Sequence, residues 1–175
     1  MLYNKGMTNE DKTVFYNKAT KKILNQLAEL KLPKQQQKKA VELVNYLRES
    51  FKKEEVKKAT LSTPEYPIWD LKYDSAGFCR VSSITFMYAM DCKDWQLMSI
   101  DDKNLDIQHH WLKHIPTGKV LDLTYDQFAY YGQSIPYEIG QKTAPNISLE
   151  ADEVVDFTKS IGFNLMEMIV RAKRK

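Results

Sequence analysis

The segment from residue 109 to residue 128 constrains the fold of this chain most, because it reads as a β-hairpin: HHWLKHIPTGKVLDLTYDQF. Its aromatic and β-branched residues predict two strands, Gln108 to Ile115 and Lys119 to Thr124. The Pro-Thr-Gly break between the strands suits a tight reversal. The hairpin therefore brings the histidines of the first strand near Asp122 of the second.

The register of the two strands decides which histidine faces Asp122. In an antiparallel ladder the numbers of paired residues have a constant sum, and a three-residue loop here makes this sum about 232 or 234. Either value places His110 on the face of Asp122 and His109 on the other face. A β-bulge that shifts the register by one residue would place His109 beside Asp122 instead. The sequence thus predicts a pair of His110 and Asp122, with His109 as the competing residue.

Cys79 opens an apolar run in the segment AGFCRVSSITFMYAM. The run from Val81 to Met90 is too uniformly apolar for a surface helix and predicts a buried central helix with Cys79 in its first turn. The N–H groups and the macrodipole at a helix N-terminus favour a thiolate, and the N–H of Cys79 can donate to an oxyanion. A helix with a cysteine, a strand with a histidine and a strand with an aspartate give the chain order of a Cys-His-Asp triad.

The motifs GFC, HHW, VLDLTYDQF and IPYEIG occur in this order along the chain. In this combination the chain resembles the papain-like and transglutaminase-like cysteine enzymes, and most of all small uncharacterised phage and bacterial members of that group. The resemblance covers about residues 75 to 140. It implies that Cys79 is the nucleophile, His110 the general base and Asp122 the residue that orients the base. The glutamine that papain-type enzymes place before the cysteine is absent, so the second oxyanion donor is unassigned.

The length of 175 residues favours one domain, residues 1–175. The expected fold class is α+β. Two amphipathic helices separated by Pro33 predict a basic helical hairpin over residues 8–58. Residues 61–175 then form the papain-like or transglutaminase-like core that the resemblance implies, with the central cysteine helix packed on an antiparallel sheet.

Three segments around the triad carry further expectations. Before the cysteine helix, prolines exclude regular helix, and Trp69 and Tyr73 are candidates either for lining a cleft or for packing. In the loop after the β-hairpin, Asp126 and Gln127 either meet substrate or hold a turn through side-chain hydrogen bonds. Near the end of the chain, residues 149–161 predict an amphipathic helix, and the residues after Gly162 fit a strand or a second helix.

Charge is distributed unevenly along the chain. Residues 1–60 hold 14 Lys or Arg against 7 Asp or Glu, a net charge of +7, whereas residues 61–175 have a net charge of −4. Clustered lysines attract nucleic acid in general. Here glutamates are interleaved with the lysines and no nucleic-acid-binding motif is present, so a solvated helix face is the better interpretation. The hairpin can instead cover the active-site cleft or bind a protein partner.

The sequence predicts no cofactor, no metal and no membrane segment. No run is long and apolar enough to span a bilayer, and the start of the chain lacks the apolar core of a signal peptide. We therefore expect a cytoplasmic protein, in the bacterial host cytosol if the chain is phage-encoded, with Cys79 and Cys92 as free thiols. A zinc site is the competing interpretation, but His110 and His114 would lie about 13 Å apart along an extended strand, too far for one ion.

These features predict a cysteine-dependent acyl-transfer enzyme of the hydrolase or acyltransferase type. Its substrate would be a protein, a peptide or a small amide, and its reaction amide hydrolysis, deamidation or transamidation through a thioester. The alternative is a catalytically inactive papain-like scaffold that serves as a phage or bacterial interaction protein. The two differ in whether Cys79 is an activated thiol.

Overall fold

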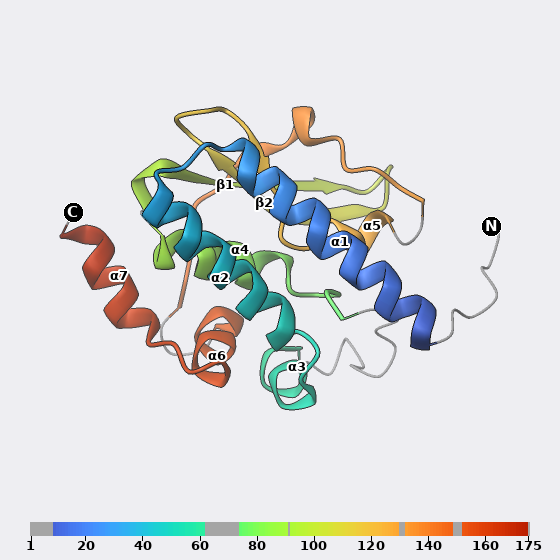
Figure 1. The fold of residues 1–175 in the computed structure, drawn as a ribbon, viewed down its shortest axis with the longest axis horizontal. Helices are drawn as coiled ribbons and strands as arrows, with labels where there is room; N and C mark the ends of the chain where they lie inside the picture. Colours follow the sequence, from blue (N-terminus) through green and yellow to red (C-terminus); the bar gives the residue numbers. More distant parts are fainter. Residues whose placement is uncertain (1–8, 62–73, 91, 130–131, 149–151, 175) are drawn as a thin grey trace.

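The computed structural model describes residues 9–61, 74–90, 92–129, 132–148 and 152–174. The fold is α+β. Within these ranges it contains seven α-helices and one four-stranded antiparallel sheet with the strand order β3-β2-β1-β4 (Figure 1). The two N-terminal helices pack on the rest of the molecule, α1 against β3 and α2 against α4.

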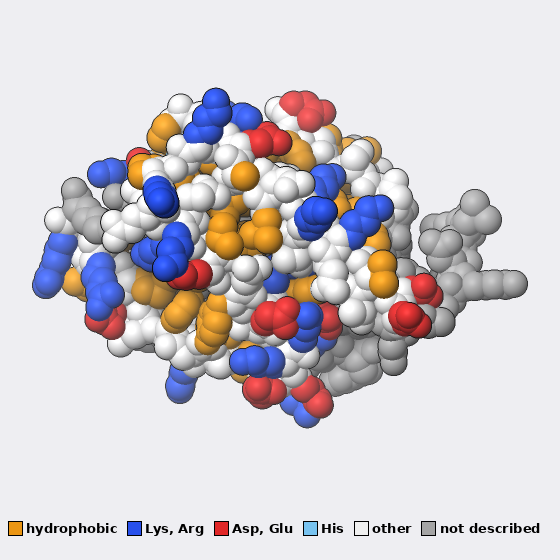
Figure 2. All heavy atoms as spheres, viewed as in Figure 1, with side chains coloured by type: hydrophobic (Ala, Val, Ile, Leu, Met, Phe, Trp, Pro, Cys, Tyr) orange, Lys and Arg blue, Asp and Glu red, His pale blue; other side chains and the backbone are white. Residues whose placement is uncertain are grey.

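The helical hairpin consists of α1, Asn9–Glu29, and α2, Lys34–Ser50. Pro33 stands at the N-cap of α2, where its missing N–H and fixed φ cost nothing. Each helix buries one apolar stripe and leaves its lysines outside, as amphipathic spacing requires. Figure 2 shows that Lys and Arg side chains are scattered over this face and separated by other residues.

A third helix, α3, spans Glu54–Leu61 and overlaps the end of the range predicted for the two-helix hairpin, residues 8–58. Its charged residues face outward, but Val56 and Thr60 are buried and the helix packs against α6. Tertiary packing therefore stabilises a helix of two turns that would be marginal in isolation.

The central helix α4 spans Cys79–Ala89, and every residue from Val81 to Met87 is buried. It packs on β1 and β2 and also contacts α2, α6 and α7. This confirms the predicted buried helix with Cys79 in its first turn. A helix covered on all sides has no place for charged side chains, and α4 has none after Arg80. The hydroxyls of Ser82 and Thr85 bond carbonyl oxygens of the same helix.

The sheet consists of β1, Trp95–Asp102, β2, Ile107–His114, β3, Val120–Leu121, and β4, Gln141–Lys142. Side chains alternate between its two faces. One face joins the main core beneath α4 through residues that include Leu97 and Leu112. The other face carries a second, smaller cluster that is closed by the segment after α5, Asp126–Ala129. Both faces of β2 are therefore shielded at the position of the histidines.

Strand β3 is shorter than the predicted strand from Lys119 to Thr124. Its end has a local cause: Oδ1 of Asp122 accepts a hydrogen bond from the N–H of Thr124 at 3.0 Å. Aspartate side chains that bond their own backbone two residues on favour a turn over a continued ladder. The strand consequently stops before the aspartate, and the chain turns into α5.

The C-terminal part adds two helices. Helix α6, Glu153–Ser160, begins after Asp152, whose carboxylate accepts a hydrogen bond from the N–H of Val154 as an N-cap. Helix α7, Leu165–Lys173, is capped in the same way by Asn164. The choice left open after Gly162 is therefore decided in favour of a helix.

Two features expected from the sequence, the aromatic residues before the cysteine helix and the lack of a membrane segment, compare with the described residues as follows. Trp69 and Tyr73, the aromatic residues considered for a cleft, lie outside the described residues. Over the part of the chain that is described, no helix is both long enough and apolar enough to cross a membrane.

Candidate active site

Cys79 is the first residue of α4, and its side chain is partly exposed. The turn before it is closed by a hydrogen bond of 3.2 Å from the N–H of Phe78 to the carbonyl oxygen of Ser75. Gly77 in this turn has a φ of 78°, and a Cβ atom there would lie 2.8 Å from Cδ2 of Leu61. Glycine is therefore required to lead the chain into the helix at this angle. The turn places the thiol at the helix N-terminus, where N–H groups lack intrahelical acceptors.

A buried polar network holds this turn in place. Oγ of Ser75 donates to Oδ2 of Asp126 at 2.9 Å, and the side-chain amide of Gln127 donates to the carbonyl oxygen of Ser75. Nη1 of Arg48 on α2 donates to Oδ1 of Asp126 at 2.7 Å, and the side chains of both charged residues are only 1% exposed. Asp126 and Gln127 thus hold the turn of residues 75–78 before Cys79 through side-chain hydrogen bonds. This is the second of the two roles considered from the sequence.

Asp122 pairs with His109 and not with His110. Nε2 of His109 lies 2.8 Å from Oδ2 of Asp122, and both side chains are fully buried. The observed β2–β3 pairs give residue numbers that add up to 233, between the two expected values. The loop comprises the four residues 115–118, because the N–H of His114 bonds the carbonyl oxygen of Lys119. The odd sum turns His109 to the face of Asp122 without a bulge, so the predicted His110–Asp122 pair is wrong.

Asp122 is held by more than the imidazole. Its Oδ1 accepts from the N–H of Thr124 at 3.0 Å, and its Oδ2 also accepts from the hydroxyl of Tyr137 at 2.7 Å. The His109 ring is enclosed by Phe128, edge-on at 4.9 Å between ring centroids, and by Trp111 at 6.1 Å. A carboxylate bonded on both oxygens, beside an aromatic enclosure, fixes the orientation of the imidazole.

The electrostatics of the site favour a thiolate beside an imidazolium. Burial raises the pKa of the Cys79 thiol, but favourable interactions with the nearby side chains of His109 and His110 outweigh this and lower the pKa to about 6. Burial lowers the pKa of His109, but the charge and hydrogen bond of Asp122 and the nearby thiol of Cys79 raise it to about 10. Between these two values, both members of the Cys79–His109 pair are charged.

The ring nitrogens of His109 have different environments. Nε2 is engaged by Asp122, whereas Nδ1 is buried and has no hydrogen-bond partner among the described residues. Since His109 lies near enough to lower the pKa of Cys79, and Nε2 is bonded to Asp122, Nδ1 is the atom left to exchange a proton with the thiol. This division of roles, one nitrogen held and one free, is the geometry of an oriented general base.

His110 also approaches the thiol but has a different setting. It is half-buried, points to the other face of β2 and stands opposite Ser99 of β1. Its interaction with the thiol contributes to the lowered pKa of Cys79, second to that of His109. The predicted base therefore lies at the site, but the carboxylate that would orient it is bonded to its neighbour.

The residue after Cys79, Arg80, ties the start of α4 to the start of α6. Its Nη1 lies 3.0 Å from Asp152 and 3.0 Å from Glu153, and its Nη2 donates to the carbonyl oxygen of Asn146 at 2.6 Å. Burial raises the pKa of the Asp152 carboxyl, but the hydrogen bond from Arg80 and others outweigh it, so the pKa lies below its usual range. The thiol is thus flanked by a second ionic anchor that the sequence did not indicate.

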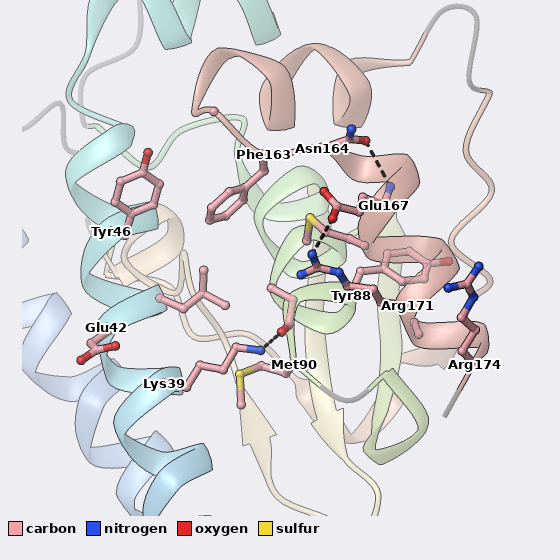
Figure 3. A pocket seen from close by; sticks show the side chains of 15 residues that line it. Lys39, Glu42, Tyr46, Tyr88, Met90, Phe163, Asn164, Glu167, Arg171 and Arg174 are labelled. Carbon is pink, nitrogen blue, oxygen red and sulfur yellow. Dashed lines mark hydrogen bonds and ion pairs between the residues drawn. The ribbon is translucent and has the colours of Figure 1, made fainter.

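A hollow of about 940 Å³ lies elsewhere, between α2, the end of α4 and α7 (Figure 3). Its lining includes apolar side chains such as Leu43 and Phe163, and charged residues from α2 and α7 surround it. None of the three residues Cys79, His109 and Asp122 lines it. The hollow is therefore separate from the candidate active site.

The described residues contain no group of three or more His, Cys, Asp or Glu side chains placed to hold a metal ion, and both cysteines are free thiols. No protein-family model, curated protein or solved structure matches this chain. A function for this chain must therefore be inferred from the geometry of Cys79, His109 and Asp122. Chemically, that geometry provides a thiolate nucleophile, an oriented proton carrier and N–H donors at a helix end.

Proposed function

We propose that this protein is a cysteine-dependent acyl-transfer enzyme with a triad of Cys79, His109 and Asp122 on a papain-like or transglutaminase-like core. The observation that carries the proposal is the buried His109–Asp122 pair beside a thiol at the start of a central helix. The packing of that helix on an antiparallel sheet supports the likeness to this core. His109 takes the role first expected of His110, because Asp122 is bonded to His109.

In the acylation step, the thiolate of Cys79 attacks the carbonyl carbon of an amide, and a carbon–sulfur bond forms. The electron pair of the carbonyl moves to oxygen, where the N–H of Cys79 at the helix end can stabilise the negative charge. When the oxyanion collapses, the carbon–nitrogen bond breaks. The imidazolium of His109 gives its Nδ1 proton to the departing nitrogen, which leaves a thioester on Cys79 and a neutral imidazole.

In the second step, His109 takes a proton from the incoming nucleophile, which attacks the thioester. The carbon–sulfur bond breaks, and the thiolate of Cys79 is restored beside the imidazolium. Water as nucleophile gives hydrolysis or deamidation, and an amine gives transamidation. The substrate is a protein, a peptide or a small amide, because the triad acts on the carbonyl group that these share. A thiol that must stay reduced suits a reducing compartment such as the cytosol.

Acylation by a generic donor tests the proposal before a substrate is known. Wild-type protein and a Cys92→Ala variant are incubated with 4-nitrophenyl acetate, and the acylated residue is located by mass spectrometry. We expect acyl transfer to Cys79 in both, no labelling at position 79 in Cys79→Ala, and slow acylation in His109→Gln. If Cys79 in wild type and in His109→Gln is acylated at the same rate, the triad is not functional.

A binding role for the N-terminal hairpin is the second candidate. The observation that favours it is the hollow between α2 and α7, where Tyr46 is 42% exposed and apolar side chains form much of the lining. A protein partner that inserts an apolar side chain would fit such a surface. The acylation experiment separates the two candidates, because a scaffold that only binds would leave Cys79 with the reactivity of an ordinary thiol.

A further inference from the structure

Tyr137 contacts the triad from a segment far from it in sequence. It opens the 3-10 turn Tyr137–Ile139, and its hydroxyl donates a hydrogen bond of 2.7 Å to Oδ2 of Asp122. Nε2 of His109 lies 2.8 Å from the same oxygen. One carboxylate oxygen is thus shared between the imidazole and the phenol, while Oδ1 is bonded by Thr124.

The position of Tyr137 is enforced by its surroundings. The edge of its ring packs against Trp111 at 5.2 Å between centroids, and Trp111 is only 1% exposed. Gly140 follows at the end of the turn, where an added Cβ atom would lie 2.1 Å from the Trp111 ring. The backbone can therefore lie flat on the indole only with glycine at this position. These contacts give a structural reason for the tyrosine and the glycine of the segment IPYEIG.

We propose that Tyr137 is a positioning residue of the triad: by sharing Oδ2 with His109, its hydroxyl holds Asp122 in place and limits how strongly the carboxylate retains the imidazolium. This rests on the proposed function. Acylation needs the imidazolium to release its proton to the departing nitrogen, and a carboxylate bonded to histidine alone would hold that proton more firmly. Burial and the nearby charge of Asp122 raise the pKa of Tyr137, so the phenol stays protonated and remains a donor.

Several titratable groups surround this oxygen and must be considered in any pH measurement. Besides Asp122, His110 acts on the Cys79–His109 pair, and Tyr125 acts on Tyr137. Tyr125 is in turn influenced by Arg48 and Asp126. Arg48 and Asp126 are paired with each other, which reduces their net effect on the site. Tyr137 is distinguished from these groups by its direct bond to the oxygen that holds His109.

The test removes only the hydroxyl. In Tyr137→Phe, with Cys92 replaced by alanine, Asp122 binds the imidazolium more strongly, and the midpoint of the His109 titration, a pKa of about 10 in the native site, should rise when it is followed by NMR of the imidazole. The expected shift is up to about one pH unit, because one unit corresponds to the free energy of one ordinary hydrogen bond. Tyr46→Phe removes a hydroxyl that bonds the carbonyl oxygen of Ile161 beside the hollow between α2 and α7, and it should leave the midpoint unchanged.

A double-mutant cycle shows whether the effect passes through Asp122. In an Asp122→Asn background, Tyr137→Phe should produce no further shift of the midpoint. An equal shift in both backgrounds, or no shift in the wild-type background, would overturn the inference. Such a result would contradict the role of Tyr137 but not the proposed triad. The proposed function itself would be contradicted if the pH dependence of Cys79 alkylation had a midpoint near the ordinary value of about 8.5 in the protein with native His109, Asp122 and Tyr137.

Discussion

Replacement of His109 by glutamine should raise the pH at which half of the Cys79 thiol is ionised, measured as the midpoint of the pH dependence of its alkylation rate. The variant is made with Cys92→Ala, so that Cys79 is the only thiol. In the native site the pKa of Cys79 is lowered to about 6, although burial acts in the other direction. Without His109, the contribution of His110 alone opposes burial. The midpoint should therefore move towards the ordinary value of about 8.5.

The size of the effect depends strongly on the pH of the assay. At pH 7 a thiol with a pKa of about 6 is roughly nine-tenths thiolate, and one with a pKa of about 8.5 is roughly 3% thiolate. The more basic thiolate is, however, about ten-fold more nucleophilic for a Brønsted slope of 0.4–0.5. The alkylation rate at pH 7 should thus fall only about two- to three-fold, whereas at pH 10 the variant should react about ten-fold faster than the native site.

The informative measurement is accordingly a full pH profile of iodoacetamide alkylation, read by intact mass from pH 5 to pH 10. His110→Gln is the matched control. It should raise the midpoint less than His109→Gln, because His110 lowers the pKa of Cys79 less than His109 does and Asp122 is bonded to His109. A larger shift in His110→Gln, or a midpoint near 8.5 in the parent protein, would refute the assignment of His109.

Three further predictions concern stability. Arg48→Met leaves the buried Asp126 carboxylate unpaired and should lower the free energy of unfolding by about 3–5 kcal/mol in urea titrations, whereas Lys119→Met at an exposed ion pair should change it by less than about 1 kcal/mol. Gly140→Ala should cost about 1–3 kcal/mol in the same assay, because its Cβ would lie 2.1 Å from an indole ring. The stability difference between wild type and Cys79→Ser should be greatest between the ordinary pKa values of about 6.5 for histidine and about 8.5 for cysteine, and it should shrink towards pH 6 and pH 10. The lowered thiol pKa contributes stability above its ordinary value and loses it as pH falls through 6, and the raised His109 pKa contributes stability below its ordinary value and loses it as pH rises through 10.

The elements that the sequence predicted well are those with a local cause. The uniform apolar run after Cys79 requires a helix buried on all sides, and α4 begins at this residue. The strand from residue 107 to residue 114 follows from its aromatic and β-branched content. Helix α3 was missed because its stability comes from Val56 and Thr60 packing on a distant helix, which no local pattern shows.

The choice between His109 and His110 could not be made from the sequence, because it depends on the parity of one number. A loop of three or five residues gives an even sum and turns His110 to Asp122, whereas the observed loop of four residues turns His109. Residue types in Ile-Pro-Thr-Gly do not determine where the ladder stops. The motif His-His-Trp therefore located the site to within one residue and left the identity of the base to the register.

Arg48 did give a signal that was overlooked. It lies four residues after Val44 and three before Phe51, so it falls on the buried stripe of α2 instead of its charged face. A charged residue in an apolar stripe needs a buried partner, because an unpaired ion in the interior is costly. Its partner Asp126 lies 78 residues away, and only the fold could identify it.

The hydrogen-bond network around Arg48 connects the N-terminal helices to the turn before Cys79, although residues 1–60 and residues 61–175 have net charges of opposite sign. Arg48 bonds Thr20 of α1, and it also pairs with Asp126, which accepts a hydrogen bond from the hydroxyl of Ser75 in the turn before Cys79. Hydrophobic residues of α1 and α2 belong to the same core cluster as those of α4 and α6. A displacement of α2 would therefore leave Asp126 uncompensated and release the turn that presents Cys79. The boundary that charge composition suggests near residue 60 is thus a change in surface composition, and the core continues across it.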